Sequence, residues 1–103
     1  MDEDFVKVEK YLWDRGNLEH IKKHKITSEE CEEVFNNRPL LVRKDVGHSQ
    51  KEERFEVLGQ ADAGQKVFLV YTVREEQIRV ISARNQSRKE RKFYEQIEKN
   101  PQI

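Results

Sequence analysis

The sequence predicts a single α+β domain in which a small curved antiparallel β-sheet is flanked by helices. The chain has 103 residues, enough for one hydrophobic core. Ile, Leu, Val and Phe account for 27 of them, above the roughly 20% typical of disordered chains. The formal net charge is zero, so self-repulsion does not hold the chain open. Apolar residues follow a helical period in the first half and alternate in the second.

The first expected elements are an edge strand and a short helix. Residues 5–13, FVKVEKYLW, mix β-branched and aromatic residues with lysines, which is typical of an edge strand. The WDRGN segment interrupts this strand, and either Asp14 or Asn17 is suited to cap a helix. That helix is predicted over residues 18–25.

A second helix is predicted from a capping box and an apolar stripe. Thr27 and Glu30 form the T-x-x-E pattern of a helix start. Cys31, Val34 and Phe35 follow with the spacing of a buried helix face. The single cysteine is therefore expected to be a buried small hydrophobe, although a reactive thiol is the alternative.

The second half is expected to form the sheet. Leu40–Asp45 has the composition of a strand and leads into three clearer strands, over residues 54–59, 66–73 and 78–84. The middle one is almost continuously apolar, as expected of a strand covered on both sides. Gly64 lies in the turn before it and is free to take positive φ. Short connections indicate an antiparallel meander.

The last element is a helix with a second capping box. Ser87 and Glu90 give the S-x-x-E pattern, and Phe93, Tyr94 and Ile97 are expected to form the apolar face. The predicted order of elements is β-α-α-β-β-β-α.

A basic segment joins the last strand to this helix. It holds six bases and one acid: Arg79, Arg84, Arg88, Lys89, Arg91, Lys92 and the acid Glu90. On a helical wheel the four helical bases lie opposite the apolar face, which is also typical of an ordinary solvated surface. Bases in a first helical turn oppose the helix dipole, which favours a functional role for them.

Strand alternation makes a prediction for the two arginines of the last strand. It directs Ser82 and Arg84 to one face of the sheet and Arg79 to the other. A two-residue turn at Glu75 and Glu76 would place Thr72 opposite Arg79.

Arg84 is a candidate phosphate ligand because it precedes a helix amino terminus. Backbone N–H donors and a guanidinium group meet at such a junction, and both suit phosphate. The alternative is that Arg84 only pairs with Glu53 or Glu90.

The polar loop GHSQKEER supplies groups for proton transfer. His48 is suited to transfer protons near neutral pH, Glu53 adds a carboxylate, and Lys51 and Arg54 add positive charge. Metal-free RNA cleavage requires a base, an acid and cations to stabilise the phosphorane. His20 and His24 lack a third ligand and the usual zinc-site context, so no metal or cofactor is expected.

Charge and hydropathy bear on location and partners. Residues 1–37 carry a net charge of −4 and residues 38–103 a net charge of +4, a layout suited to oppositely charged partners. The acidic MDEDF start does not look like a signal peptide, and no run approaches the roughly 20 apolar residues of a membrane span. We therefore expect a cytoplasmic protein.

Four blocks of the sequence resemble the BrnT toxins of bacterial type II toxin–antitoxin modules. They are WDRGN, KHKITSEECEEVF, HSQKEERFEVLG and IRVISARNQSRKERKFYE, in the family's order. The resemblance covers residues 13–95, and the last block is its most specific part. The chain departs from the family at Lys25, where BrnT sequences usually have Gly; the position is expected to end a helix.

The resemblance implies a RelE-like fold and a toxin that arrests growth by cleaving RNA. It also implies neutralisation by a BrnA-like antitoxin, whose ribbon-helix-helix part would link the complex to operator DNA. The implied catalytic residues are His48, Glu53, Arg84 and Glu90, and the implied RNA-binding residues are Lys51, Arg54, Arg79, Arg88 and Tyr94.

Two other functions fit the same basic residues. A non-enzymatic interaction module would use its basic face to bind an acidic antitoxin or a transcriptional co-repressor, because guanidinium groups attract carboxylates as well as phosphates. Growth arrest on expressing the chain alone would favour the toxin. A plain nucleic-acid binder is less well supported, because no aromatic ladder accompanies the basic residues.

Overall fold

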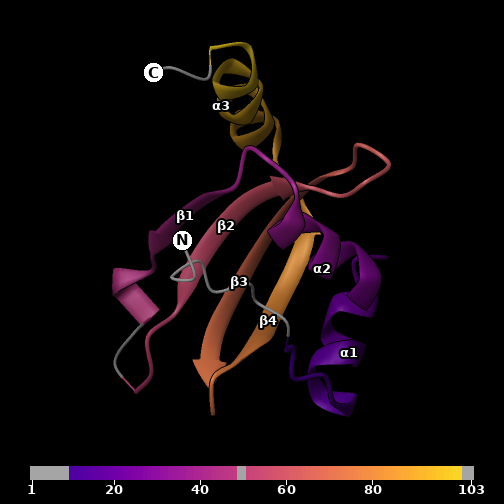
Figure 1. Cartoon of the computed structure of the whole chain (residues 1–103), viewed down its shortest axis with the longest axis vertical. Helices are drawn as coiled ribbons and strands as arrows, with labels where there is room; N and C mark the ends of the chain where they lie inside the picture. Colours follow the sequence, from indigo (N-terminus) through magenta and orange to yellow (C-terminus); the bar gives the residue numbers. More distant parts are fainter. Residues whose placement is uncertain (1–9, 49–50, 101–103) are drawn as a thin grey trace, which may run out of the picture.

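The computed structural model describes residues 10–48 and 51–100 as an α+β domain (Figure 1), which confirms the predicted class. The elements in chain order are helices α1 (Arg15–Lys22) and α2 (Ser28–Asn36), strand β1 (Leu41–Lys44), the 3₁₀ helix η1 (Val46–His48), strands β2 (Phe55–Gln60), β3 (Lys66–Arg74) and β4 (Gln77–Asn85), and helix α3 (Arg88–Lys99). None of the helices in these ranges is long and apolar enough to cross a membrane.

The predicted order of elements needs one correction, since two helices come first and four strands follow them. Most of the edge strand expected over residues 5–13 lies outside the described residues. Within residues 10–13, Tyr11 forms only an isolated parallel bridge with Ile78. The chain then turns away because Asp14 caps α1, so no strand extends further. The strand predicted over Leu40–Asp45 is observed as Leu41–Lys44 and pairs with β2.

The four strands form one antiparallel sheet in the order β1-β2-β3-β4. Glu75 and Glu76 have φ of 52° and 65°, so they form the two-residue turn that fits the twist of a hairpin. Thr72 pairs with Arg79 as predicted. Gly64 has φ of 94° in the preceding turn, which confirms the prediction for that position.

A β-bulge interrupts the pairing of β3 with β4. Val70 pairs with Ser82 and Tyr71 pairs with Val80, so Ile81 is the extra residue. The extra residue reverses the alternation along β4. The prediction that Arg79 and Arg84 lie on opposite faces is therefore wrong, since the bulge brings both to the same face.

The core lies between α1, α2 and one face of the sheet. Ile21, Cys31 and Val34 of the helices are buried together with Val57 and Leu69 of the strands. Burial raises the pKa of the Cys31 thiol to about 12, so this cysteine is the inert hydrophobe that was predicted.

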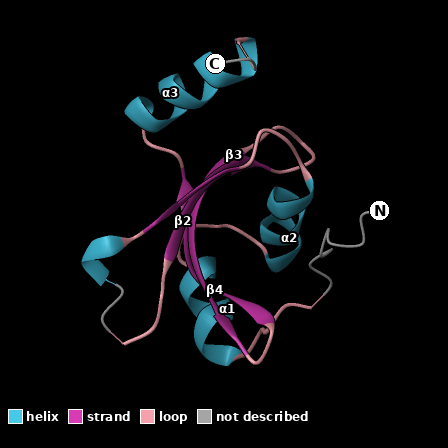
Figure 2. Cartoon of the chain, turned by 60° about the vertical axis from the view of Figure 1, so that its left-hand side comes forward, coloured by secondary structure: helices cyan, strands magenta, loops and turns pink. Residues whose placement is uncertain are grey.

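Neither α1 nor α2 covers the opposite face of the sheet. Figure 2 shows the sheet nearly edge-on, with α2 to one side. Along β3, Val67 and Leu69 are buried, whereas Phe68 and Val70 on the other face are half-buried. The expectation that this strand is covered on both sides is therefore wrong, and its half-buried face belongs to the surface described below.

Capping boxes start all three α-helices. The predicted boxes at Thr27 and Ser87 are both formed, and Asp14 and Asn17 make a third one. Helix α1 consequently starts at Arg15, three residues before the predicted boundary. Lys25 has φ of 63° after this helix, a conformation that favours glycine and fits the predicted helix end.

Helix α3 packs over one end of the sheet through a narrow strip. Tyr94 is fully buried, and its hydroxyl donates to the Pro39 carbonyl oxygen at 2.5 Å. Lys66 Nζ lies 5.3 Å from the Tyr94 ring centroid and pairs with Glu98 at 3.1 Å. Phe93 was predicted to face the core, but 52% of it is exposed, because α3 contacts the sheet along the Tyr94 side. Figure 1 shows this helix beyond the ends of the strands.

Helix α2 approaches the sheet most closely at Gly59, so Gly59→Ala is expected to destabilise the fold. A Cβ there would lie 2.6 Å from Val34 Cγ1, within the buried core. Such overpacking costs about 1–3 kcal/mol, which should lower the urea midpoint of unfolding. The control is Gly47→Ala, because a Cβ there meets nothing closer than Asp45 Oδ1 at 3.9 Å. Equal midpoints for the two variants would contradict this account of the packing.

Candidate nucleic-acid interface

The sheet face opposite the core, called the second face here, combines half-buried apolar residues with charged side chains. Pairing and burial assign these residues to it: Arg43, Glu56, Leu58, Phe68, Val70, Thr72, Arg79, Ser82 and Arg84. Arg79 pairs with Thr72 and Arg84 pairs with Phe68. Those two partners are four residues apart on β3, so the two arginines stand about 13 Å apart along the strand direction.

The Arg79 end of this face contains a hollow of about 240 Å³. Its walls come from α1, from the segment before β2 and from the β3–β4 hairpin. The lining residues are Gly16, Asn17, His20, Glu52, Arg54, Arg74, Arg79 and Ile81. We call this hollow the arginine pocket, since three of its eight residues are arginines.

Arg79 is fixed in the pocket by a carboxylate. Its Nη1 and Nη2 donate to Asp14 Oδ2 and Oδ1 at 2.6 and 3.3 Å, and 16% of its side chain is exposed. The hydrogen bond from Arg79 is the main reason that the pKa of Asp14 is lowered. A Cβ on Gly16 would lie 3.3 Å from Asp14 Oδ1 and 3.7 Å from Arg79 Nη2, so the glycine keeps the pair open to the pocket.

A second carboxylate, that of Glu52, binds Arg74. Glu52 accepts from Arg74 Nε and Nη2 at 3.2 and 2.9 Å. The hydrogen bond from Arg74 lowers the pKa of Glu52, and the charges of Arg54 and Arg79 lower it further. Three guanidinium groups therefore line one hollow, and guanidinium groups are suited to bind an anion.

Asn17 fixes the amino-terminal turn of α1 against β4. It is buried, and its side-chain amide donates to the carbonyl oxygens of Leu12 and Val80 at 2.9 and 3.0 Å. His20 lies on the next turn and reaches the pocket as an exposed side chain. His20 was predicted only as an unlikely metal ligand. Its i, i+4 spacing from Gly16 could have indicated a shared helix face, but not what that face overlooks.

The other end of the second face is formed where β4 meets α3. Arg84 Nη1 and Nη2 donate to the two oxygens of Glu90 at 2.9 and 3.1 Å, and Nη1 also donates to the Asn85 carbonyl oxygen at 3.0 Å. The hydrogen bond from Arg84 lowers the pKa of Glu90. Of the two pairings considered for Arg84, the one with Glu90 is observed. The guanidinium carbon lies 4.1 Å from the Phe68 ring centroid.

Arg43 and Glu56 form a neighbouring ion pair, with Arg43 Nε 2.7 Å from Glu56 Oε1. The pKa of Arg43 is raised, mainly by the hydrogen bond to Glu56, and Glu90 acts in the same direction. Sequence analysis did not select either residue, because their proximity depends on the register of β1 against β2.

The predicted site residues occupy several places. Arg54 and Arg79 line the arginine pocket, and Arg84 and Glu90 pair at the β4–α3 junction. Figure 1 places α3 and η1 toward opposite ends of the sheet. His48 is exposed, and its Nδ1 lies 3.2 Å from both carboxylate oxygens of Asp45. Glu53 pairs with Lys44 at 3.1 Å. Lys51 and Arg88 are exposed, and Tyr94 is buried.

Comparison with known protein families supports the resemblance found in the sequence. A family model described as "Ribonuclease toxin, BrnT, of type II toxin-antitoxin system" matches residues 13–90. The match includes α1 and every strand, and it ends in the first turn of α3. A comparison with curated proteins found no match.

The Arg79–Asp14 pair predicts a measurable change in the titration of Asp14. Replacing Arg79 by Gln should raise the pKa of the Asp14 carboxyl toward its ordinary value, because the main cause of lowering is lost. In the native protein the pair should persist at neutral pH and break only as the pH falls through the lowered pKa. Carboxyl NMR titration measures both. Arg15→Gln is the control, since Arg15 pairs with Glu19; the same Asp14 curve in all three proteins would contradict the assignment.

Proposed function

Because the chain belongs to the BrnT family of ribonuclease toxins from type II toxin–antitoxin systems, we propose that it is an endoribonuclease that cuts RNA at the arginine pocket. The observation that carries the proposal is the convergence of Arg54, Arg74 and Arg79 on one hollow. Like charges repel, so such a cluster is favoured only where carboxylates hold it and an anion can enter. A phosphodiester is the anion that the family's activity provides.

The reaction proposed for this pocket is attack of the RNA 2′ oxygen on the adjacent phosphorus. The bond from phosphorus to O2′ forms while the bond from phosphorus to O5′ breaks, giving a 2′,3′-cyclic phosphate and a 5′-hydroxyl. Negative charge grows on the non-bridging oxygens in the transition state. In this proposal the donors to these oxygens are Arg54 and the N–H groups of Arg79 that are not bound to Asp14, and preorganised donors of this kind contribute strongly to catalysis.

The 2′-hydroxyl loses a proton in this step and the 5′ oxygen gains one, and His20 is the pocket residue suited to one of these transfers. As a neutral imidazole it would accept the proton of the 2′-hydroxyl, and water would supply the proton that the leaving 5′ oxygen takes up. Arg79 and Arg74 stabilise the charged forms of Asp14 and Glu52. These carboxylates therefore orient the guanidinium groups instead of donating protons.

The proposal requires no metal ion. Among the residues that the structure describes, no three His, Cys, Asp or Glu side chains are grouped to hold one. The guanidinium groups can supply the charge stabilisation that a metal would otherwise give.

We also propose a protein partner for the toxin. The family description implies a cognate antitoxin, and the sequence resemblance indicates a BrnA-like ribbon-helix-helix protein that would carry the complex to operator DNA. Free toxin would then arrest growth by cutting cytoplasmic RNA. The exposed bases of α3 are suited to an acidic partner: Arg88, Lys89, Arg91 and Lys92. The same exposed bases fit the second candidate function, a non-enzymatic interaction module.

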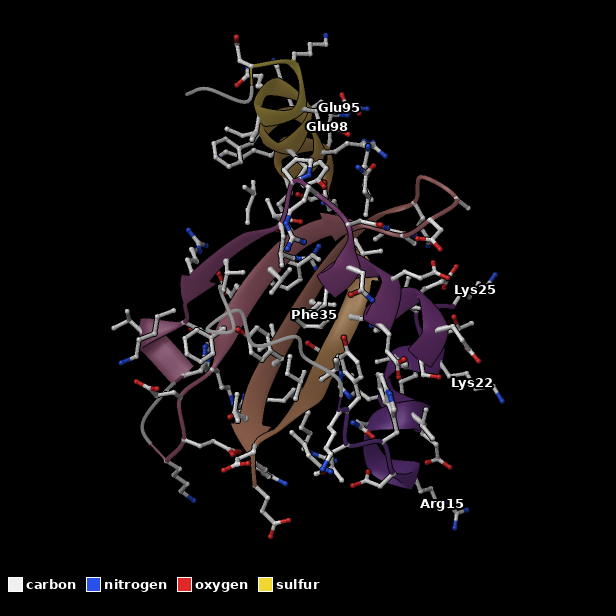
Figure 3. All side chains as sticks on the ribbon, in the orientation of Figure 1. Arg15, Lys22, Lys25, Phe35, Glu95 and Glu98 are labelled. Carbon is white, nitrogen blue, oxygen red and sulfur yellow. The ribbon has the colours of Figure 1, made fainter. Side chains whose placement is uncertain are left out.

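RNA cleavage in the presence of a chelator tests the proposed reaction. Arg79→Gln and Arg54→Gln should each lower kcat/KM by about 100-fold or more, the usual cost of losing one transition-state donor. Arg15→Gln removes the same charge from an exposed side chain that points away from the body of the protein (Figure 3), and it should change the rate less than about twofold. Full activity in both pocket variants, or dependence on a divalent metal, would contradict the proposal.

The role of His20 is tested by the pH dependence of the same reaction. His20→Asn should slow cleavage by about 100- to 10,000-fold, the usual contribution of acid–base catalysis, and should remove one limb of the pH–rate profile. His24→Asn is the matched control, since His24 follows α1 and does not line the pocket. A His20→Asn profile that keeps the native shape would assign proton transfer to another residue.

A further inference from the structure

We propose that Arg84 and Phe68 form a stacking platform for one unpaired nucleobase of the RNA strand whose phosphate enters the arginine pocket. This inference rests on the proposed function and adds a base-binding subsite to it. The ligand class is a nucleobase in single-stranded RNA. It differs from the phosphate-binding role that the sequence predicted for Arg84.

The donor edge of Arg84 is already occupied. Both terminal nitrogens donate to Glu90, and one of them also donates to the Asn85 carbonyl oxygen. Glu90 Oε1 additionally accepts from the Ser87 backbone N–H at 2.9 Å, as part of the capping box of α3. A phosphate taking the same edge would have to displace Glu90 from both the arginine and the helix cap.

The flat faces of the guanidinium group are a binding surface of Arg84 that its hydrogen bonds to Glu90 and Asn85 do not use. One face lies against the Phe68 ring, at 4.1 Å from the guanidinium carbon to the ring centroid. The side chain is nevertheless 39% exposed. The proposal assigns this exposed part of the side chain to the guanidinium face opposite Phe68. Guanidinium planes and aromatic rings are the surfaces on which proteins stack unpaired bases.

The platform lies where a strand leaving the pocket can reach it. The bulge at Ile81 puts Arg84 on the same face as Arg79, about 13 Å along the sheet. Between them lie Ile81 and Val70, which are half-buried and uncharged. Backbone phosphate at one end and a stacked base at the other form the usual combination for single-stranded nucleic acid.

The test is abasic scanning of a short single-stranded RNA that carries 2′-O-methyl groups throughout. This RNA cannot be cleaved, because no free 2′-hydroxyl is present, so the measurement reports binding alone. Removing the base at one position should weaken binding by about 5- to 150-fold, the range for one stacked base. Removing bases elsewhere should have a smaller effect.

The platform variants should abolish that position-specific loss. Arg84→Lys keeps the charge but not the plane, and Phe68→Leu removes the ring; each should bind the intact RNA as weakly as the native protein binds the abasic one. Phe68→Tyr should restore the difference, which separates stacking from misfolding. Phe93→Leu is the matched control, since Phe93 is an exposed aromatic residue on α3, and it should retain the native pattern.

The outcomes separate this inference from the proposed reaction. Absence of any position-specific loss, its persistence in Arg84→Lys and Phe68→Leu, or its disappearance in Phe93→Leu would each overturn the platform. An RNA that binds with the platform pattern but is not cut in its 2′-hydroxyl form would overturn the ribonuclease reaction and leave the platform intact. No binding of the RNA would overturn both.

Discussion

A single extra residue in β4 determines which side chains share the second face of the sheet. Without the bulge at Ile81, alternation would direct Arg79 and Arg84 to opposite faces of the sheet, and one of them would meet the core side. With it, Val80 and Ala83 both remain buried while the two arginines share the second face. Bulges next to functional sites often change the direction of side chains in this way. Both the buried core on one face of the sheet and the charged surface on the other depend on the bulge at Ile81.

Carboxylates hold most of the arginines of this face. Asp14, Glu52, Glu56 and Glu90 bind Arg79, Arg74, Arg43 and Arg84 respectively. Exposed pairs of this kind add little stability, so their main effect is to fix long side chains in one geometry. The ion pairs differ in which part of the arginine they leave available for a ligand. In the pocket, three guanidinium groups line one hollow, whereas at Arg84 the carboxylate binds both terminal nitrogens and the flat faces of the guanidinium group remain.

Local signals in the sequence predicted the elements well, because caps and turns depend on neighbouring residues. The boxes at Thr27 and Ser87, the hairpin at Glu75 and Glu76 and the buried Cys31 are examples. The features that the sequence did not predict depend on contacts between segments that are distant in the chain. The bulge arises between two strands, Phe93 is exposed because α3 packs along Tyr94, and His20 gains its surroundings only when α1 lies beside β4. Of the candidate site, the arginine types could therefore be predicted, but not their grouping.

Helix α3 tolerates a basic first turn because a local capping interaction offsets the unfavourable position of the cations. Cations near a helix amino terminus cost up to about 1 kcal/mol each and less when exposed, whereas the Ser87–Glu90 box contributes about 1 kcal/mol in the opposite direction. The Ser87–Glu90 box therefore secures the start of the helix, and the exposed bases around it do not take part in the cap. Because Glu90 also binds Arg84, it joins a local helix signal to the second face. The remaining bases of α3 are exposed, and under the proposed function their positive charge would speed the approach of RNA.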